Sequence, residues 1–203
     1  MRRASLVVFL VLLIDQFIKI YIKTHFFLGE EVHVIGNWFI LHFTENPGMA
    51  FGYELDFSWG KLALSLFRII AIGALIYYLV GLVRRKAHYG LIVSISLITA
   101  GAIGNILDSA FYGMIFNQSM FHEKAILFPP DGGYAGFLHG KVVDMLYFPL
   151  FSFTWPHWIP WFGGSIFEFF QPVFNIADSS ITIGVTLILL FQKSFFSKQE
   201  TVQ

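Results

Sequence analysis

Four stretches of mostly apolar residues divide this chain, and each has the length of about 20 residues that a helix needs to cross a lipid bilayer. They run over residues 4–22, 62–83, 89–107 and 173–192. Of all 203 residues, 56% are hydrophobic and only 13% are charged, whereas about a quarter of the residues in a soluble domain carry a charge. The sequence therefore predicts one integral membrane domain over residues 1–203, all-α in its membrane part, with four transmembrane helices.

The first apolar stretch begins like a secretory signal peptide, because Arg2 and Arg3 precede it. Asp15 and Lys19 interrupt the stretch, however, and no pair of small residues that would mark a cleavage site follows it. We expect it to stay in the protein as the first membrane helix.

Lysine and arginine residues are retained on the cytoplasmic side of a membrane, so their distribution predicts the orientation of the chain. Residues 1–3, 84–88 and 193–203 carry seven of them in 19 positions. The long connections 23–61 and 108–172 carry only four in 104 positions. We therefore expect both termini to be cytoplasmic and the two long connections to face outward.

The two outer connections are unusually apolar. Residues 31–44 are rich in Val, Ile, Trp and Phe with partial alternation, which predicts one or two strands of a small extracytoplasmic β element. Residues 147–170 contain eleven aromatic residues and three prolines. Because the prolines interrupt any long helix and aromatic rings favour the headgroup region, we expect this stretch to lie along the membrane surface as an interfacial helix.

Composition excludes several functions. The 13 basic and 13 acidic residues cancel, so the chain has no cationic surface for nucleic acid. Without a cysteine it has no thiolate nucleophile or disulfide, and its seven histidines show neither a zinc-binding motif nor regular ligand spacing. We therefore expect neither a metal nor another cofactor, and any chemistry to come from carboxyl, amide or amine groups.

Charged side chains inside membrane spans cost about 2.5 to 3.5 kcal/mol each on insertion scales and usually mark function. Asp15 lies in the outer half of the first span, Asp108 ends the third, and Asp178 lies near the outer start of the fourth. All three carboxylates therefore approach one level of the bilayer. Lys19 follows Asp15 by one helical turn, so this pair is explained equally well by a structural ion pair and by a site.

Two segments repeat the pattern Asn-x-x-Asp, at residues 105–108 and 175–178, and each sets an amide and a carboxylate on one helical face. Asp144 is a further acid, in an apolar run of the second outer connection, where a lone carboxylate is more often a surface group. Two adjacent carboxyls that share a proton can activate water, as in aspartic peptidases. The residues alone leave open which of Asp15, Asp108, Asp144 and Asp178 would form such a pair.

Five motifs that occur in order resemble lipoprotein signal peptidase, also called signal peptidase II. The resemblance runs from about residue 12 to 185, and its motifs are Asp15-Gln16, ENPGMAFG at 45–52, GAIGNILD at 101–108, VVD at 142–144 and FNIADSSI at 174–181. It implies a multi-pass aspartic endopeptidase of the bacterial inner membrane with its active site near the outer face. Such an enzyme removes the signal peptide from prolipoproteins, before a cysteine that carries diacylglycerol, and its family is inhibited by globomycin.

The resemblance also implies roles for individual residues. Asp144 and Asp178 match the catalytic aspartates, which would activate one water between them. The positions that match residues shaping the pocket or orienting the substrate are Asn46, Asn105, Asp108 and Asn175, with Asp15 in a supporting role. The implied partners are diacylglyceryl-modified prolipoproteins and membrane lipid, and we expect the chain to act as a monomer because every motif lies in one chain.

The sequence departs from the family pattern in two respects. Ser109 stands where the family has arginine after the third-span motif, and Arg68 is a candidate substitute for that guanidinium group. The outer connection is also longer than usual, with additions that include residues 116–139 and the aromatic stretch. A second interpretation is a small proton-coupled transporter that uses the buried carboxylates as a relay, but the cytoplasmic halves of the second, third and fourth spans carry none.

Overall fold

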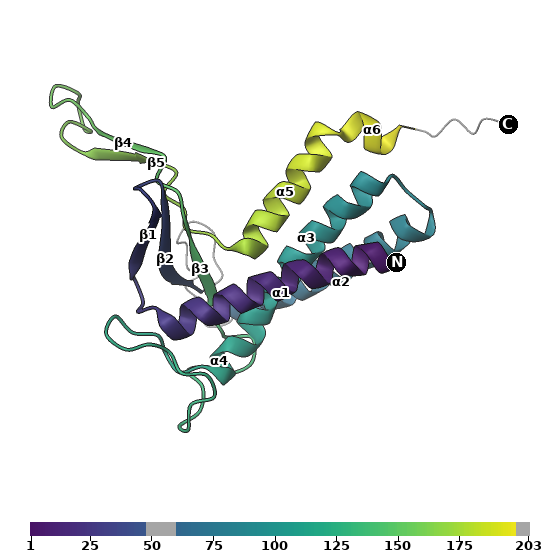
Figure 1. Ribbon diagram of the computed structural model, residues 1–203, viewed down its shortest axis with the longest axis horizontal. Coiled ribbons are helices and arrows are strands. Elements are labelled where there is room, and N and C mark those ends of the chain that lie inside the picture. The colour runs from purple at the N-terminus through teal and green to yellow at the C-terminus, as the bar shows by residue number, and fades with distance from the viewer. Residues whose placement is uncertain (48–59, 198–203) are drawn as a thin grey trace.

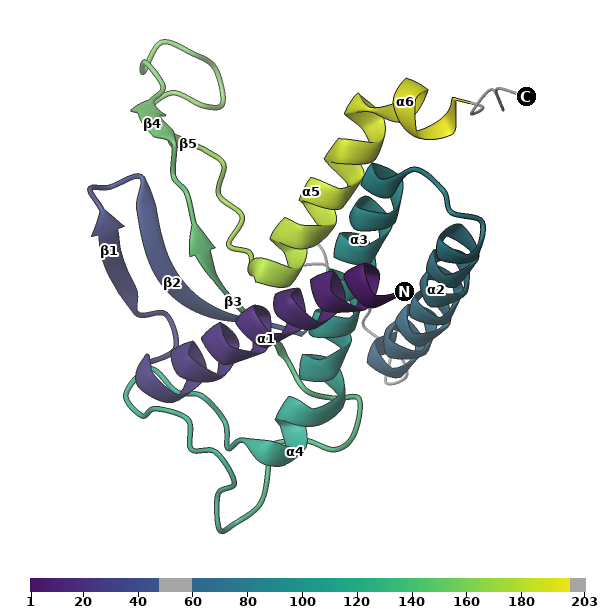
Figure 2. The ribbon, with the colours of Figure 1, turned by 45° about the vertical axis from the view of Figure 1, so that its right-hand side comes forward.

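The protein, described by a computed structural model over residues 1–47 and 60–197, is built around three long apolar helices. These are α1 (Arg2–His25), α2 (Gly60–Arg84) and α3 (Tyr89–Leu107), and among the described residues they alone meet the length and hydropathy of a membrane span. Both α1 and α2 pack against α3, as Figure 2 shows. The first three predicted spans are thus confirmed as apolar helices of sufficient length.

A turn of π-helix, η1 (Asp108–Tyr112), continues α3 and leads into the short α4 (Gly113–Ile115). Such wide turns often occur at functional sites, because they redirect side chains at the end of a regular helix. Here the wide turn begins at Asp108, the carboxylate that ends the third predicted span.

The fourth apolar helix, α5 (Ile176–Leu190), is shorter than predicted and is followed by α6 (Gln192–Phe196). With 15 residues it is below the length of about 20 that crosses a bilayer unaided. It packs closely on α3 because glycines line the contact: a Cβ at Gly101 would lie 2.2 Å from the carbonyl oxygen of Ala177. Figure 1 shows the N-terminus and α6 at the same end of the bundle, opposite the sheet.

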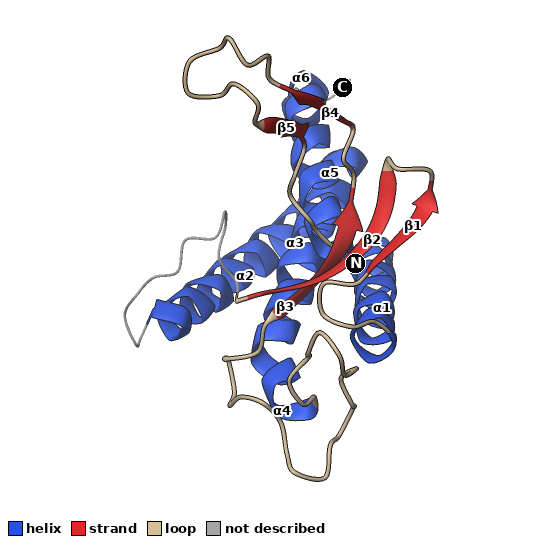
Figure 3. Ribbon diagram, turned by 90° about the vertical axis from the view of Figure 1, so that its left-hand side faces the viewer, coloured by secondary structure: helices blue, strands red, loops and turns tan. Residues whose placement is uncertain are grey.

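A three-stranded antiparallel sheet covers the other end of the bundle, with the order β1 (Glu31–Ile35), β2 (Phe39–Asn46) and β3 (Val142–Tyr147). The predicted strands within residues 31–44 are therefore confirmed. The third strand comes from the distant second connection, about 100 positions along the chain, and pairs with β2 so that Asp144 lies opposite Thr44. Figure 3 shows this sheet beside the helices.

The aromatic stretch is not a helix. It forms a β-hairpin of β4 (Phe151–Thr154) and β5 (Ile166–Phe169), which stands apart from the three-stranded sheet in Figures 1 and 3. The prediction of an interfacial helix here was wrong. Its alternation of aromatic and small polar residues has the period of two that suits a strand, and the three prolines disfavour a helix.

The sheet is attached to the bundle by a small core at the end of α1. Ile22 of α1 packs there with Phe43 of β2, Val143 and Met145 of β3, and Phe116 after α4. Four of these five side chains are fully buried and the fifth is nearly so. Because Val143 and Met145 point into this core, Asp144 between them points to the opposite face of the strand, toward α5.

Candidate functional site

Asp178 lies in the first turn of α5, where it completes a capping box with Asn175. The Asn175 side-chain oxygen accepts the backbone N–H of Asp178 at 2.9 Å, and the Asp178 carboxylate accepts the N–H of Asn175 at 3.4 Å. From α3, Asn105 donates its amide to the other carboxylate oxygen of Asp178 at 2.7 Å. The side chain is half-buried, so water reaches it.

Asp144 approaches the same point from β3. It is 4% exposed, and its Oδ1 atom accepts a hydrogen bond from Nδ2 of Asn175 at 2.7 Å. Burial, followed by the negative charge of Asp178, raises the pKa of Asp144 to about 7. Asp144 therefore holds a proton at pH values where an ordinary aspartate is ionised.

Two amides connect these carboxylates. Asn175 contacts Asp144 and also donates to Oδ1 of Asn105 at 3.1 Å, while Asn105 contacts Asp178. The two Asn-x-x-Asp segments thus meet in one hydrogen-bonded group. Of the four aspartates that the sequence left open, Asp144 and Asp178 are the two that this group brings together.

Asp15 and Asp108 belong to a neighbouring charged cluster centred on Lys19. The buried Lys19 ammonium group lies 3.0 Å from Asp15 and 2.8 Å from Asp108, and it donates to Oδ1 of Asn105 at 2.9 Å. Removing any one partner would leave an uncompensated charge in a low-dielectric interior. Lys19 is therefore more than a local partner of Asp15, because it joins α1 to the amide group that holds Asp178.

Asp15 and Asp108 also position the elements that carry the other two acids. Oδ1 of Asp15 accepts the N–H of Ala177 at 2.9 Å, which satisfies a free donor at the start of α5. Oδ2 of Asp108 accepts the N–H of Val143 at 3.4 Å, next to Asp144, and its Oδ1 accepts the amide of Gln16 at 2.9 Å. These contacts fix α5 and β3 relative to α1 and α3.

The remaining sequence candidates lie at the border of this group. Asn46 ends β2 and pairs in register with Val142, two residues before Asp144. Arg68 projects from α2 within electrostatic range of Asp178. Residues 48–52 of the motif that follows Asn46 lie outside the described residues.

Comparison with known proteins decides the family. The model of the family described as signal peptidase (SPase) II matches residues 7–194. This chain belongs to the signal peptidase II family. A lipoprotein signal peptidase of Porphyromonas gingivalis strain W83 is 54% identical over 188 residues, which cover 92% of this chain and 80% of that protein.

More distant relatives agree with this assignment. A lipoprotein signal peptidase of Amoebophilus asiaticus is 38% identical over 96% of this chain and 78% of its own length. A bacterial membrane enzyme solved by the in meso method at 2.3 Å resolution aligns with a TM-score of 0.64 and 26% identity, over 100% of this chain and 96% of that chain. The protein is thus a multi-pass membrane peptidase of the aspartic type, and the comparisons do not support a transporter.

Ser109 shows what replaces the arginine that we expected from the signal peptidase II pattern. Its side chain is only 2% exposed and donates to the carbonyl oxygen of Asn105 at 3.2 Å. Gly140 lies against the backbone at this position, because the Gly140 N–H donates to the Ser109 carbonyl oxygen at 2.8 Å. A Cβ at Gly140 would lie 2.2 Å from the carbonyl oxygen of Asp108, so the loop before β3 occupies this space.

Sequence reasoning missed a second buried ion cluster beside the site. Lys23 pairs with Glu45 of β2 and donates to Ser119 at 2.8 Å, while Lys141 lies 3.4 Å from the other Glu45 oxygen. Burial is the largest influence and raises the pKa of Glu45, but the Lys23 charge, the hydrogen bonds from Lys23 and Ser119 and the Lys141 charge together outweigh it, so the net shift of the pKa is downward. Lys23 follows Lys19 by one helical turn, and this spacing was the one available indication in the sequence.

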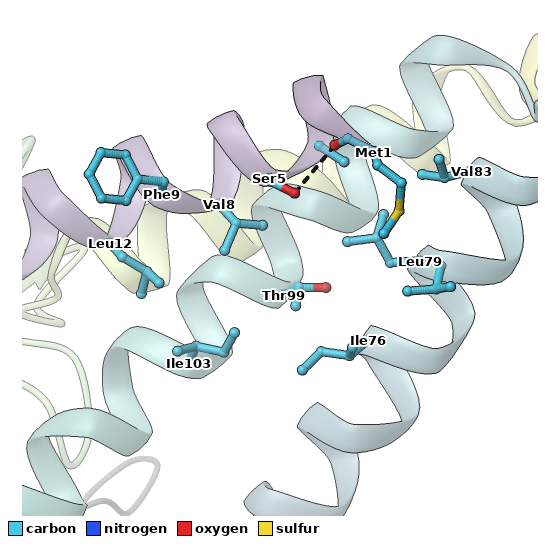
Figure 4. Close-up of a pocket in the computed structure, with 12 residues that line it drawn as sticks. Met1, Ser5, Val8, Phe9, Leu12, Ile76, Leu79, Val83, Thr99 and Ile103 are labelled. Atoms are coloured by element: carbon cyan, nitrogen blue, oxygen red, sulfur yellow. Dashed lines mark hydrogen bonds between the residues drawn. The ribbon is translucent and has the colours of Figure 1, made fainter.

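An apolar cavity of about 390 Å³ lies elsewhere in the bundle, between α1, α2 and α3. Figure 4 shows Leu12, Ile76, Leu79 and Ile103 pointing into it. The one hydrogen bond drawn there joins Ser5 to the carbonyl oxygen of Met1. None of the site carboxylates lines this cavity, so it contributes no acid or base.

Proposed function

We propose that this peptidase removes signal peptides from prolipoproteins by cleaving before a diacylglyceryl-modified cysteine, with Asp144 and Asp178 as its catalytic pair. The observation that carries the assignment is the contact of both carboxylates with Asn175, whose amide donates to Asp144 and whose backbone donates to Asp178. Carboxyl groups held so close favour one shared proton, which is the arrangement that activates water.

The unequal surroundings of the two acids assign their roles. Asp178 accepts hydrogen bonds from the Asn105 amide and the Asn175 N–H, which stabilise its ionised form. It therefore takes the proton from water as the water oxygen attacks the scissile carbonyl carbon. Asp144, which keeps its proton up to about pH 7, donates a hydrogen bond to the developing oxyanion. It then transfers that proton to the leaving nitrogen as the carbon–nitrogen bond breaks.

The other candidates hold the pair or the substrate. Lys19, Asp15 and Asp108 fix the positions of α5 and β3 through buried contacts. Asn46, at the open end of β2, is placed to bind the extended cleavage segment by its amide. Arg68 of α2 interacts electrostatically with Asp178. It supplies the positive charge of the family's arginine, whose position is occupied here by Ser109.

We also propose that the chain lies in the bacterial inner membrane as a monomer, with both termini cytoplasmic and the catalytic pair near the outer face. Support comes from the concentration of Lys and Arg at the ends and in the short α2–α3 connection. The N-terminus and α6 lie together at one end of the bundle, which agrees with one shared side (Figure 1). The diacylglyceryl chains of the substrate would then stay in lipid while its cleavage segment meets the pair.

Mass spectrometry of a prolipoprotein incubated with the purified protein tests this function. We expect cleavage immediately before the lipidated cysteine and inhibition by globomycin. The matched control is the same precursor with that cysteine replaced by serine, which cannot receive diacylglycerol and should stay intact. A lipidated precursor that remains whole with the wild-type protein would refute the proposal.

A further inference from the structure

The hairpin formed by β4 and β5 has one aromatic face and one face of mixed polarity. In its register Phe151 lies opposite Phe169, and Phe153 lies opposite Phe167. The first pair stacks with ring centroids 4.8 Å apart, and the centroids of the second lie 5.1 Å apart. Because successive side chains of a strand point to opposite faces, these four rings share one face.

The other face of β4 carries the two hydroxyl residues Ser152 and Thr154, both exposed. Ile166 of β5, which is 68% exposed, lies opposite Thr154, so this second face mixes polar and apolar residues and carries no aromatic ring. The four rings of the aromatic face are also exposed, between 38% and 53% of their surface, although Trp155 packs beside Phe153 and Phe167.

The loop that joins the two strands carries further exposed aromatic residues. Trp161 is 97% exposed and Trp158 is 81% exposed. Tryptophan is enriched where a membrane meets water, because its ring is apolar and its N–H finds a hydrogen-bond partner in the headgroups. In water, the exposure of two such rings would cost free energy, because their apolar surface would be hydrated.

Charge and length argue for lipid as the covering partner. Residues 145–167 contain no Asp, Glu, Lys or Arg, and Glu168 in β5 is the one such residue of the hairpin, so the aromatic face and the loop offer no ion pair to a protein or a nucleic acid. An isolated two-stranded hairpin is only marginally stable in water. The hairpin belongs to a chain that is already a membrane protein. The two ends of the hairpin connect to β3 and to the N-cap of α5, at the sheet end of the bundle.

We propose that the hairpin, residues 151–169, inserts its aromatic face and tryptophan loop into the lipid leaflet at the sheet end of the bundle, with Ser152 and Thr154 facing water. Three residues separate Tyr147, which ends the strand of Asp144, from Phe151, and six residues separate Phe169 from Ile176, where α5 begins. Insertion would therefore hold the candidate site at the level of the headgroups. It requires no peptide cleavage, so it stands or falls independently of the proposed function.

Site-directed spin labelling tests this placement, because the chain has no native cysteine. The variants Trp161→Cys and Ser152→Cys, each labelled with a nitroxide, are reconstituted into vesicles of zwitterionic phosphatidylcholine. Collision of the label with oxygen, which concentrates in lipid, is compared with collision with a neutral nickel chelate, which stays in water. We expect the label at 161 to favour oxygen and the label at 152 to favour the chelate.

Two further positions calibrate the measurement. Ile70→Cys, 72% exposed on α2, supplies the lipid value, and Asp131→Cys, at an exposed charged residue, supplies the water value. A label at 161 that matches Asp131→Cys would overturn the proposal. Dipolar broadening between labels at 161 would also overturn it, because a second copy of the chain would then cover the hairpin. Because the four rings and the tryptophan loop include no Asp, Glu, Lys or Arg, the expected result persists at high salt.

Discussion

The side chain of Asn175 lies between two elements, with its Nδ2 atom 2.7 Å from Oδ1 of Asp144 on β3. The same residue is the N-cap of α5, and its Oδ1 atom accepts the N–H of Asp178. One amide therefore starts a helix and also holds a carboxylate from a strand. This double use couples the geometry of the proposed catalytic pair to the folding of α5.

Replacing either acid of the pair by its amide should abolish cleavage without unfolding the protein. For Asp144→Asn and Asp178→Asn we expect turnover to fall by roughly 100-fold to 10,000-fold, because each loses a proton donor or acceptor. Cleavage of a lipidated precursor measures the effect, and thermal unfolding in detergent checks the fold. Wild-type turnover in either variant would refute the pairing.

The rate of cleavage should fall as pH rises above neutrality. Asp144 must be protonated to act as the acid, and its pKa is raised to about 7 by burial and then by the charge of Asp178. As pH rises through about 7 the proton is lost, so kcat/KM should fall, approaching a tenfold loss per pH unit. A profile that stays level above this pH would contradict the assigned roles.

Asp144 should also make the folded protein less stable at higher pH. Its pKa rises from 3.8 to about 7 on folding, so the folded state binds the proton more tightly than the unfolded chain. The free energy of unfolding then decreases as pH rises from about 4 to about 7. The total decrease is on the order of 4 kcal/mol, for a shift of about three pKa units. Asp144→Asn removes this dependence, so above pH 7 its melting temperature should exceed that of the wild type.

Asn175→Ala tests whether the amide tunes the acid or only caps the helix. The hydrogen bond from Asn175 stabilises ionised Asp144, so its loss should move the basic limb of the kcat/KM profile to higher pH. Loss of the cap should cost about 1 kcal/mol of stability. Asn175→Ser keeps a capping oxygen and should recover stability without restoring the limb. A profile that is unchanged per folded molecule would assign Asn175 a structural role alone.

Restoring arginine at position 109 should destabilise this chain. Ser109 is 2% exposed beneath Gly140, so a guanidinium group there would displace the loop before β3. Overpacking of this kind costs about 1 to 3 kcal/mol. Ser109→Ala, which loses only the hydrogen bond to Asn105, should cost about 1 kcal/mol. Equal unfolding temperatures for Ser109→Arg and the wild type would contradict this.

Local patterns in the sequence were sufficient for much of the fold. The first three spans and the strands within residues 31–44 followed from apolar length and from alternation. The prediction of a helix at the hairpin was wrong because it rested on the aromatic composition. The alternation of aromatic and polar residues over 151–154 has the period of two that is typical of a strand. Lys23 and Glu45 were missed because no local pattern connects residues that a helix and a distant strand bring together.

The sequence alone determined that this chain lies in a membrane and carries acids at one level of it, since burying apolar side chains and neutralising charges depend on residue type and spacing. Only the tertiary structure decided that Asn175 hydrogen-bonds to both Asp144 and Asp178 while Lys19 neutralises Asp15 and Asp108. That outcome depends on β3 pairing with β2, a contact between residues about 100 positions apart. Such pairing is set by the packing of the whole chain, which spacing along the sequence does not encode.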